Sequence, residues 1–324
     1  MSLPIRGHSF LVIGGAGFIG SHLVEQLLSA GASLVRVYDN LSRGRLSNLG
    51  EALKDPRCEL FPGGADILHR DTLNTAMQGI DGVFHLAALW LLHCNEYPRS
   101  AFEVNVGGTM NVAEACISNG IRRLVYSSSA SVYGDAVFEP MDESHPLNCE
   151  EFYGATKVCG EYLLKALYCR PVCREKKLSY VGLRYMNVYG PRQDDKGAYV
   201  GVVTRMINAL QAGQAPIIHG DGSQAYDFVD VRDCARANIL AMQSSAAMRC
   251  YNVGTGIKTS IKELVNVLQS IFPRSPAADF EAVDRPFVRN RIGSTILAKR
   301  DLQFESTIEL RQGLLNLCNF QSLM

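Results

Sequence analysis

A glycine-rich run near the N-terminus constrains the fold more than any other part of the sequence. The run Gly14-Gly15-Ala16-Gly17-Phe18-Ile19-Gly20 ends an apolar segment that starts at Ser9, and it precedes Ser21–Leu28, whose apolar residues recur at helical spacing. This order predicts a strand, a tight turn and a helix. Gly14 allows the sharp turn, Gly17 lets the backbone approach a pyrophosphate, and Gly20 lets the helix pack closely on the strand. The N–H groups of the first helical turn would then face the phosphates of a dinucleotide.

A second predicted strand supports the dinucleotide interpretation. It covers Ser33–Asp39 and ends in a carboxylate about 20 residues after the glycines, as a dinucleotide-binding βαβ unit requires. Asp39 is expected to hold the adenosine ribose hydroxyls, and its charge would repel a 2′-phosphate, which favours NAD over NADP. The nearby Arg43 keeps NADP open as an alternative. A glycine turn without a ligand is the other alternative, and the complete βαβ context makes it the weaker one.

Composition excludes several classes of protein. The chain has 324 residues, with 32 Lys+Arg and 32 Asp+Glu and no long block of either sign, so nothing favours binding to nucleic acid or an anionic membrane. The ten cysteines include no Cys-x-x-Cys pair and the seven histidines no His-Glu-x-x-His, so neither a metal site nor a disulfide framework is indicated. A signal-peptide pattern and an apolar run of about 18 residues are both lacking. We therefore expect a cytoplasmic α/β protein with a small-molecule partner.

The rest of the chain alternates predicted strands and helices. Asp66-Ile67 follows a short strand and is a candidate adenine contact, and Leu86-Ala87-Ala88 ends the next strand, where small residues would let the cofactor lie close to the sheet. A strand that starts at Ile121 leads into Ser127–Gly134, whose hydroxyls would emerge at the carboxyl edge of the sheet. Further expected helices span 98–119, 151–169, 200–212 and 231–243, and two more open with the capping boxes Ser260-x-x-Glu263 and Ser306-x-x-Glu309.

The helix expected over 151–169 carries a candidate catalytic pair. Tyr153 and Lys157 lie four residues apart and therefore share a helix face. A phenol has a pKa of about 10, so a phenolic base at neutral pH needs a neighbouring cation, which Lys157 would supply. A hydroxyl from Ser127–Ser129 could hold the same substrate oxygen, so that the set removes a proton from an alcohol while hydride passes to NAD. For the pair taken alone, a solvated Tyr/Lys stripe is the alternative.

In this order, the residues resemble the extended short-chain dehydrogenase/reductases that act on nucleotide sugars, and within them the epimerases of the UDP-glucose 4-epimerase type. The resemblance covers nearly the whole chain, and its segments are Gly14–Gly20, Asp39-Asn40-Leu41, Asp66-Ile67, His85–Ala88, Asn105-Val106, Ser127–Ala130, Tyr153-x-x-x-Lys157, Arg184–Asn187 and Gly220–Gln224. It implies a Rossmann-type doubly wound parallel sheet with a smaller, interleaved C-terminal substrate domain. Residues 1–180 would form the NAD-binding domain, with return segments near 225–254, and residues 181–324 the nucleotide-sugar-binding domain.

The same resemblance implies roles for individual residues. Tyr153 would be the acid/base, Lys157 would bind the nicotinamide ribose and lower the phenol pKa, and Ser129 would bond the reacting hydroxyl. Besides Gly14, Gly17, Tyr153 and Lys157, the cofactor-binding residues would be Phe18, Ile19, Gly20, Asp39, Asn40, Asp66, Ile67, Leu86, Ala87, Ala88 and Asn105. The substrate-binding residues would be Trp90, Ser129, Asn187, His219, Tyr226, Arg289 and Arg291, with Asn187 on the sugar diphosphate.

Two departures from the family pattern bear on the activity. Related dehydratases have Thr-Asp-Glu where this chain has Ser129-Ala130-Ser131, so the acidic residue needed to expel water is missing and epimerisation is favoured. Tyr226 stands where an arginine usually grips the diphosphate. The candidates to replace that arginine are Arg285, Arg289 and Arg291.

The sequence thus predicts an NAD-dependent nucleotide-sugar 4-epimerase, an isomerase of carbohydrate biosynthesis that works through a transient 4-keto intermediate. A dehydratase, reductase or decarboxylase of the same fold is the second interpretation. The third is a dinucleotide sensor without catalysis, although such a protein should lack the Tyr/Lys pair. The family also implies a homodimer through the helices expected over 98–119 and 151–169. Packing against the sheet is the alternative explanation of their apolar residues.

Overall fold

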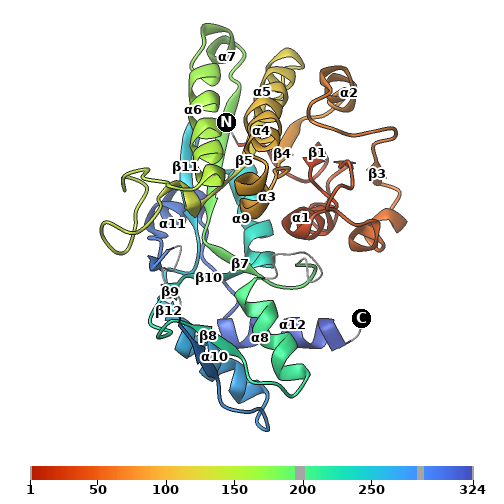
Figure 1. The fold of residues 1–324 in the computed structure, drawn as a ribbon. Helices are drawn as coiled ribbons and strands as arrows, with labels where there is room; N and C mark the ends of the chain where they lie inside the picture. Colours follow the sequence, from red (N-terminus) through yellow and green to blue (C-terminus); the bar gives the residue numbers. More distant parts are fainter. Residues whose placement is uncertain (1, 194–200, 283–287, 323–324) are drawn as a thin grey trace.

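A seven-stranded parallel sheet forms the larger part of the molecule (Figure 1). The computed structural model describes residues 2–193, 201–282 and 288–322. In the order β11-β6-β5-β4-β1-β2-β3, the strands are Arg249–Val253, Ser179–Tyr185, Arg123–Ser129, Gly82–His85, Ser9–Ile13, Leu34–Tyr38 and Cys58–Leu60. Every neighbouring pair is parallel, and the order reverses between β1 and β4. The predicted doubly wound α/β fold is confirmed.

Residues of one strand alternate between two cores, because successive side chains point to opposite faces of a sheet. Phe10 and Val12 of β1 belong to the core formed with α1 (Phe18–Ser29) and α9 (Val231–Gln243). Leu11 and Ile13 belong to the core on the other face, and the helices there are α2 (Arg70–Ala76), α5 (Thr109–Ser118), α6 (Phe152–Tyr168) and α7 (Pro171–Glu175). Helices therefore cover both faces, which explains why β1 is one continuous apolar run after its first residue.

A smaller lobe, drawn below the sheet in Figure 1, has an apolar core of its own. Its helices are α8 (Val202–Gln211), α10 (Ile261–Ile271) and α12 (Leu310–Ser322), which meet through Ile207, Leu264 and Leu314. Its short strands are β7 (Asn187–Tyr189), β8 (Ile217–His219), β9 (Ala225–Tyr226), β10 (Phe228–Asp230), β12 (Thr259–Ser260), β13 (Asp279–Glu281) and β14 (Asn290–Arg291). Residue 200, the expected start of the helix over 200–212, lies outside the described residues.

The chain passes between the two lobes several times. It leaves the sheet after β6, returns through α9 and β11, leaves again for α10, and then adds α11 (Ile296–Leu302) against β11 before ending in α12. The buried carboxylate of Asp227 fastens one of these crossings, since it accepts hydrogen bonds from Thr255 N (2.8 Å), Thr255 Oγ1 (2.7 Å) and Gly256 N (2.9 Å). The lobes are thus joined by several connections and by buried hydrogen bonds.

The helix expected over 98–119 is present but not uniform. It consists of α4 (Pro98–Ala101), a π-helical segment (Phe102–Gly108) and α5. A π-helical segment is typical of a site where a local constraint overrides the ordinary helical register. Here Asn105 is held by hydrogen bonds to the loop at Leu89, and a Cβ on Gly108 would collide with the side chain of Ile67. A short helix that we did not predict, α3 (Leu91–Glu96), lies directly before α4.

Of the two predicted capping boxes, one is confirmed and one is wrong. Ser260 Oγ accepts the N–H of Glu263 (3.1 Å) and Glu263 Oε2 accepts the N–H of Ser260 (2.7 Å), so α10 begins at Ile261 as expected. No helix begins directly after Ser306. The N–H groups of Thr307 and Ile308 donate to the buried carboxylate of Asp233, and α12 begins only at Leu310. Asp233, which is distant in sequence, thus accepts N–H groups near Ser306 that a local capping box would have used.

A buried arginine at the start of β5 caps the end of α9. The Arg123 guanidinium donates to the carbonyls of Ala241 (3.1 Å), Ala246 (2.5 Å) and Ser244 (3.2 Å), and the side chain is fully buried. Burial lowers the pKa of Arg123 to about 10, which leaves it charged at neutral pH. Because the last carbonyls of a helix lack intrahelical partners, a cation here stabilises the packing of α9 on the sheet.

We expect Arg123→Met to lower the free energy of unfolding by about 3 kcal/mol, because buried carbonyls lose a charged donor. Arg122→Met is the matched control: Arg122 is exposed and pairs with Asp81 at the surface, so its loss should cost less than about 1 kcal/mol. Urea unfolding followed by circular dichroism measures both. Equal losses in the two variants would contradict the capping role of Arg123.

Candidate functional site

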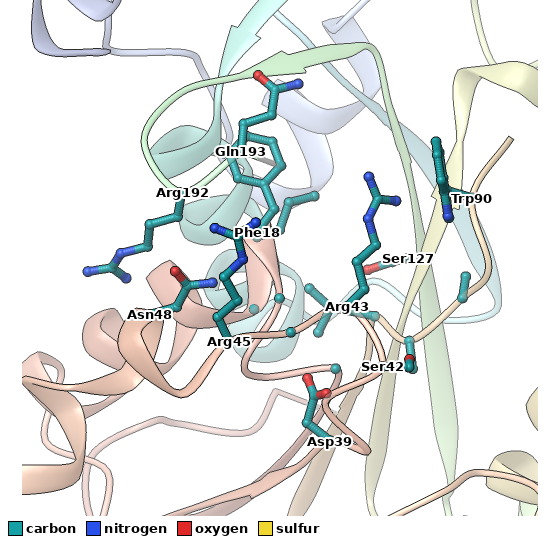
Figure 2. Close-up of a pocket in the computed structure, with 18 of the residues that line it drawn as sticks. Phe18, Asp39, Ser42, Arg43, Arg45, Asn48, Trp90, Ser127, Arg192 and Gln193 are labelled. Carbon is teal, nitrogen blue, oxygen red and sulfur yellow. The ribbon is translucent and has the colours of Figure 1, made fainter. Parts of the chain in front are cut away.

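A cavity of about 730 Å³ opens at the carboxyl edge of the sheet, where the strand order reverses (Figure 2). Such a crevice is where open α/β sheets bind ligands. Its floor is formed by the residues that end β1, β2, β4 and β5, and its far side by the smaller lobe. The lobe contributes Thr204, Asn208 and Gln211 of α8 and Leu317, Phe320 and Gln321 of α12. The cavity therefore lies between the two lobes and has the size of a small-molecule site.

The glycine turn forms one wall of this cavity. Gly14 has a φ of 83°, and a Cβ at this residue would lie 2.8 Å from the backbone nitrogen of Ala87. A Cβ on Gly20 would collide with the carbonyl oxygen of Gly14. Helix α1 starts with Gly17 as its N-cap, without a side-chain cap or an acidic residue in its first turn. Its first N–H groups are thus directed at the cavity without a side-chain acceptor, as an anion-binding helix end requires.

Asp39 follows β2 and lines the same cavity. Its carboxylate accepts hydrogen bonds from Ala16 N and Leu41 N, both at 2.9 Å, so it holds the glycine turn as well as its own loop. Burial raises the pKa of Asp39, while these two N–H groups oppose the change. Next to it, Asn40 Nδ2 donates to Asp66 Oδ2 (3.2 Å). Asp39, the expected ribose contact, and Asp66, the expected adenine contact, therefore lie in neighbouring loops that this hydrogen bond joins.

The loop that follows Asp39 also lines the cavity, and sequence reasoning missed it as a site. It contributes Ser42, Arg43, Gly44, Arg45, Ser47 and Asn48. Asn48 Nδ2 donates to Ala16 O (2.9 Å), which fixes the loop to the glycine turn. The guanidinium of Arg43 lies 4.1 Å from the ring centre of Trp90 across the cavity (Figure 2). The one available signal was the position of this polar loop directly after a strand that ends at the ligand-binding edge.

The candidate catalytic residues meet at the end of β5. Tyr153 and Lys157 both line the cavity from α6, and the side chain of Ser129 is close enough to Tyr153 to lower the pKa of its phenol. Lys157 Nζ donates to the carbonyl of Ser127 (2.8 Å) and lies 5.7 Å from the centre of the Tyr153 ring. The structure thus brings the predicted Ser, Tyr and Lys side chains together, although Ser129 lies behind Tyr153 and outside the cavity lining.

Burial dominates the ionisation of this pair. It raises the pKa of Tyr153 to about 12, against the opposing effects of the Ser129 side chain and of the charges on Arg43 and Arg291. It also lowers the pKa of Lys157 to about 8, while Cys94 and, to a smaller extent, the charge of Glu161 act in the opposite direction. Tyr153 is therefore a protonated phenol at neutral pH in this structure, and nearby positive charge is what would favour its phenolate form.

Most of the expected cofactor residues line the cavity, and Asn105 does not. The members of that set in the lining are Gly14, Gly17, Phe18, Ile19, Gly20, Asp39, Asn40, Asp66, Ile67, Leu86, Ala87, Ala88, Tyr153 and Lys157. Asn105 is buried behind it, where its amide nitrogen donates to Leu89 O (3.0 Å) and Thr156 Oγ1 (3.1 Å) and its oxygen accepts from Leu89 N (2.7 Å). In this structure it supports the loop that carries Trp90.

Of the expected substrate residues, Trp90 alone lines this cavity. Asn187 starts β7. His219 is exposed near Glu281, and the Tyr226 hydroxyl donates to Val288 O (2.9 Å). Arg289 is exposed, whereas Arg291 is paired in register with Tyr226 and lies 3.5 Å from Ser131 Oγ through its Nη1. Arg285 lies outside the described residues.

The described part of the chain has neither a metal-binding cluster nor a membrane-spanning helix. No cluster of three or more His, Cys, Asp or Glu side chains there could hold a metal ion. No helix in those ranges has the length and apolar composition needed to span a bilayer.

The residues of the cavity fit a dinucleotide. The glycine turn leaves space that a Cβ would fill, the start of α1 offers N–H groups to a pyrophosphate, and Asp39 stands at the end of the second strand for a ribose. Tyr153 and Lys157 line the same cavity.

Comparison with known proteins agrees with this geometry. Residues 10–254 match the model of the NAD dependent epimerase/dehydratase family. The chain is 34% identical over 316 residues to a UDP-glucose 4-epimerase of Mycolicibacterium smegmatis, across 96% of this chain and 97% of the relative. The structure of the UDP-N-acetylglucosamine 4-epimerase from Methanobrevibacter ruminantium M1 in complex with UDP-N-acetylmuramic acid superposes with a TM-score of 0.90 at 30% identity, covering 98% and 100% of the two chains.

A second solved structure adds the cofactor. MoeE5, in complex with UDP-glucuronic acid and NAD, is 30% identical to this chain, with a TM-score of 0.84 and coverage of 97% and 99%. The resemblance inferred from the motifs is confirmed by these matches. The chain belongs to the NAD-dependent epimerase/dehydratase family, among its nucleotide-sugar epimerases, and its cofactor is NAD.

Proposed function

We propose that this enzyme is a nucleotide-sugar 4-epimerase, with Ser129, Tyr153 and Lys157 as its catalytic residues. The observation that carries the proposal is that Tyr153 and Lys157 line the same cavity as the glycine turn, with Ser129 close to Tyr153 at the end of β5. The M. smegmatis relative is named for UDP-glucose, and both structural neighbours hold UDP-sugars, so a UDP-sugar is the proposed substrate. Bound NAD would accept a hydride from carbon 4 of the sugar and return it to the opposite face.

The protein's own part in this reaction is to move one proton and to fix the reacting oxygen. Tyr153 Oη takes the proton of the 4-hydroxyl as that oxygen becomes a ketone, and gives it back when the alcohol re-forms. Ser129 holds the same oxygen. Lys157 Nζ lies 5.7 Å from the centre of the Tyr153 ring, and its positive charge would favour the phenolate form. The two sugars then interconvert with no net redox change.

Two of the alternatives, the dehydratase and the sensor without catalysis, fit the described residues less well than an epimerase; a reductase or a decarboxylase of the same fold stays an alternative. A dehydratase needs an acid to expel water from the neighbouring carbon, and the corresponding positions are the buried Ala130 and Ser131. A non-catalytic dinucleotide sensor would have no use for the buried Lys157 with its single backbone acceptor at Ser127. We therefore favour epimerisation over both.

For the substrate side, we propose Arg291 as the arginine that replaces the one missing at Tyr226. In the pairing of β14 with β9, Arg291 is the direct neighbour of Tyr226, so the two side chains leave the sheet on the same side. Its guanidinium reaches Ser131 and acts on the Tyr153 pKa, whereas Arg289 is exposed. Asn187, Trp90 and His219 remain proposed substrate contacts.

Tyr153→Phe tests the acid/base role. The variant keeps the ring but loses the oxygen that carries the proton, so kcat should fall by roughly 10²- to 10⁴-fold while the substrate still binds. NMR of the sugar products after incubation with UDP-sugars measures kcat, and calorimetry measures binding. Ser129→Ala is expected to cost less. Undiminished turnover by Tyr153→Phe would rule out this assignment.

An isotope experiment separates epimerisation at carbon 4 from other chemistry. A UDP-sugar deuterated at carbon 4 should keep its label in both epimers, because the hydrogen leaves and returns without exchange with water. Mass spectrometry of the products gives the deuterium content, and ²H₂O with unlabelled substrate is the reverse control. Loss of the label to solvent would rule out return of the hydride from bound NAD, and deuterium taken up from ²H₂O at another carbon would point to a reaction at that carbon.

We also propose that the enzyme is a cytoplasmic homodimer that associates through the helical segment 98–118 and α6. These two lie side by side in Figure 1, and they expose Phe102 (49%) and Tyr162 (59%), which are large apolar side chains. Leu164 and Leu167, in contrast, are buried in the core next to the sheet and are not available to a partner. Ten free cysteines suit a reducing compartment.

The dimer proposal predicts that Phe102→Glu combined with Tyr162→Glu shifts the protein toward a monomer, because charges would enter an apolar contact. Sedimentation over a range of concentrations measures the state of both proteins. Glu substitutions at the exposed Leu46 and Leu53, on another part of the surface, serve as the control. A wild-type monomer at every concentration would refute the dimer without affecting the proposed reaction.

A further inference from the structure

Three consecutive serines at the end of β5 each contact a different residue of α6. Ser129 is close enough to Tyr153 to lower the pKa of its phenol, the carbonyl of Ser127 accepts from Lys157 Nζ (2.8 Å), and Ser128 Oγ donates to Glu161 Oε1 (2.5 Å). The three helix residues are spaced four apart, so they form one stripe on α6. The proposed function uses the first two contacts and leaves the third without a role.

Glu161 is also the centre of a buried ion pair. Its carboxylate accepts from Arg184 Nε (2.9 Å) and Arg184 Nη2 (2.6 Å), and both side chains are 7% exposed. Arg184 lies on β6, in register with Ser128 on β5, so the two residues approach Glu161 from adjacent strands. The carboxylate therefore joins α6 to two strands of the sheet next to the catalytic residues.

The network extends from there to the return strand β11. Arg184 Nη1 donates to the Tyr133 hydroxyl (2.8 Å), which donates to Asn252 Oδ1 (2.6 Å). Asn252 Nδ2 in turn donates to Met141 O (2.9 Å) and Ser294 O (3.2 Å). The Glu161–Arg184 pair is therefore connected through hydrogen bonds to β11 and to the segments at Met141 and Ser294.

The charges that face Lys157 give Glu161 a second effect. The titratable neighbours on the other packed elements are His85 of β4, Cys94 of α3 and Tyr126 of β5, together with Tyr153 on its own helix. Burial keeps each of these neutral near pH 7: it lowers the pKa of His85 to about 3, and it raises the pKa of Cys94 to about 11, of Tyr153 to about 12 and of Tyr126 well above its usual value. Among these groups, the salt-bridged carboxylate of Glu161 is the one negative charge.

We propose that Glu161 is a positioning residue of the reaction: it holds the end of β5 against α6 through Ser128, and its charge keeps Lys157 protonated. The proposal rests on the proposed function for the roles of Tyr153 and Lys157. A purely structural ion pair is the competing explanation. It would affect stability alone, whereas a positioning residue also affects kcat and the pH at which Lys157 loses its proton.

Glu161→Gln in the NAD-bound protein tests this proposal, because it keeps the shape and removes the charge. The Lys157 titration is followed by NMR with ¹³C at lysine Cε, and its signal is assigned by its loss in Lys157→Met. Without the neighbouring carboxylate the protonated form is less favoured, so the midpoint should fall by about one pH unit. The alkaline limit of kcat should move down with it, while kcat falls about 10- to 100-fold and KM changes little.

Two further variants keep the test decisive. If Glu161→Gln does not fold because Arg184 is left buried without its partner, Glu161→Gln with Arg184→Gln removes both charges and keeps hydrogen-bonding amides. Ser128→Ala leaves the ion pair intact and should lower kcat without moving the Lys157 midpoint. Asp233→Asn is the control for loss of a buried carboxylate, since its partners Arg236, Thr307 and Ile308 lie outside the cavity.

The outcomes separate the explanations. A folded Glu161 variant with an unchanged Lys157 midpoint and a kcat within twofold of wild type would overturn the proposal and leave a structural ion pair. A wild-type protein that epimerises no nucleotide sugar would refute the proposed function instead. In that case the Lys157 midpoint, which needs no substrate, still decides whether Glu161 sets the charge of Lys157.

Discussion

The reversal of strand order between β1 and β4 is the constraint on which the site depends. Crossover helices leave these two strands toward opposite faces of the sheet, so their loops diverge and leave a crevice at the carboxyl edge. The glycine turn lies on one side of the crevice and the backbone of Ala87 on the other. The two are so close that a Cβ on Gly14 would collide with the backbone nitrogen of Ala87. The remaining parts, including the Asp39 loop and the end of β5, are arranged around that opening.

Buried charges are the second organising feature, and each has a specific set of partners. Arg123 donates to the carbonyls at the end of α9, Asp227 accepts hydrogen bonds where the chain crosses between the lobes, and Arg184 forms an ion pair with Glu161. Such groups are costly to bury, and removing one partner leaves the other uncompensated. These charges lie at the ends of helices and strands and where the chain crosses between the lobes, which indicates that they determine how these elements are oriented. The two apolar cores of the sheet supply most of the stabilisation.

Local signals in the sequence predicted much of the fold and the centre of the site. The alternation of strand and helix, the glycine spacing and the four-residue interval between Tyr153 and Lys157 depend only on neighbours along the chain, and the sheet topology confirmed the fold. The second capping box failed because Asp233, far away in sequence, captured the N–H groups that Ser306 would have used. The cavity wall from α8 and α12 had no local signal, because it depends on how the lobes meet.

The path of the chain between the lobes has a consequence for how the protein can be divided. Helix α9 and strand β11 come from residues after the first visit to the smaller lobe, yet they complete one face and one edge of the sheet. A fragment that stops near residue 180 would lack most of β6 and the whole of β11, and it would expose the apolar face that α9 covers. Residues 1–180 alone therefore do not contain every element of the dinucleotide-binding lobe. Because the lobes share these elements, thermal unfolding of the two lobes should be cooperative.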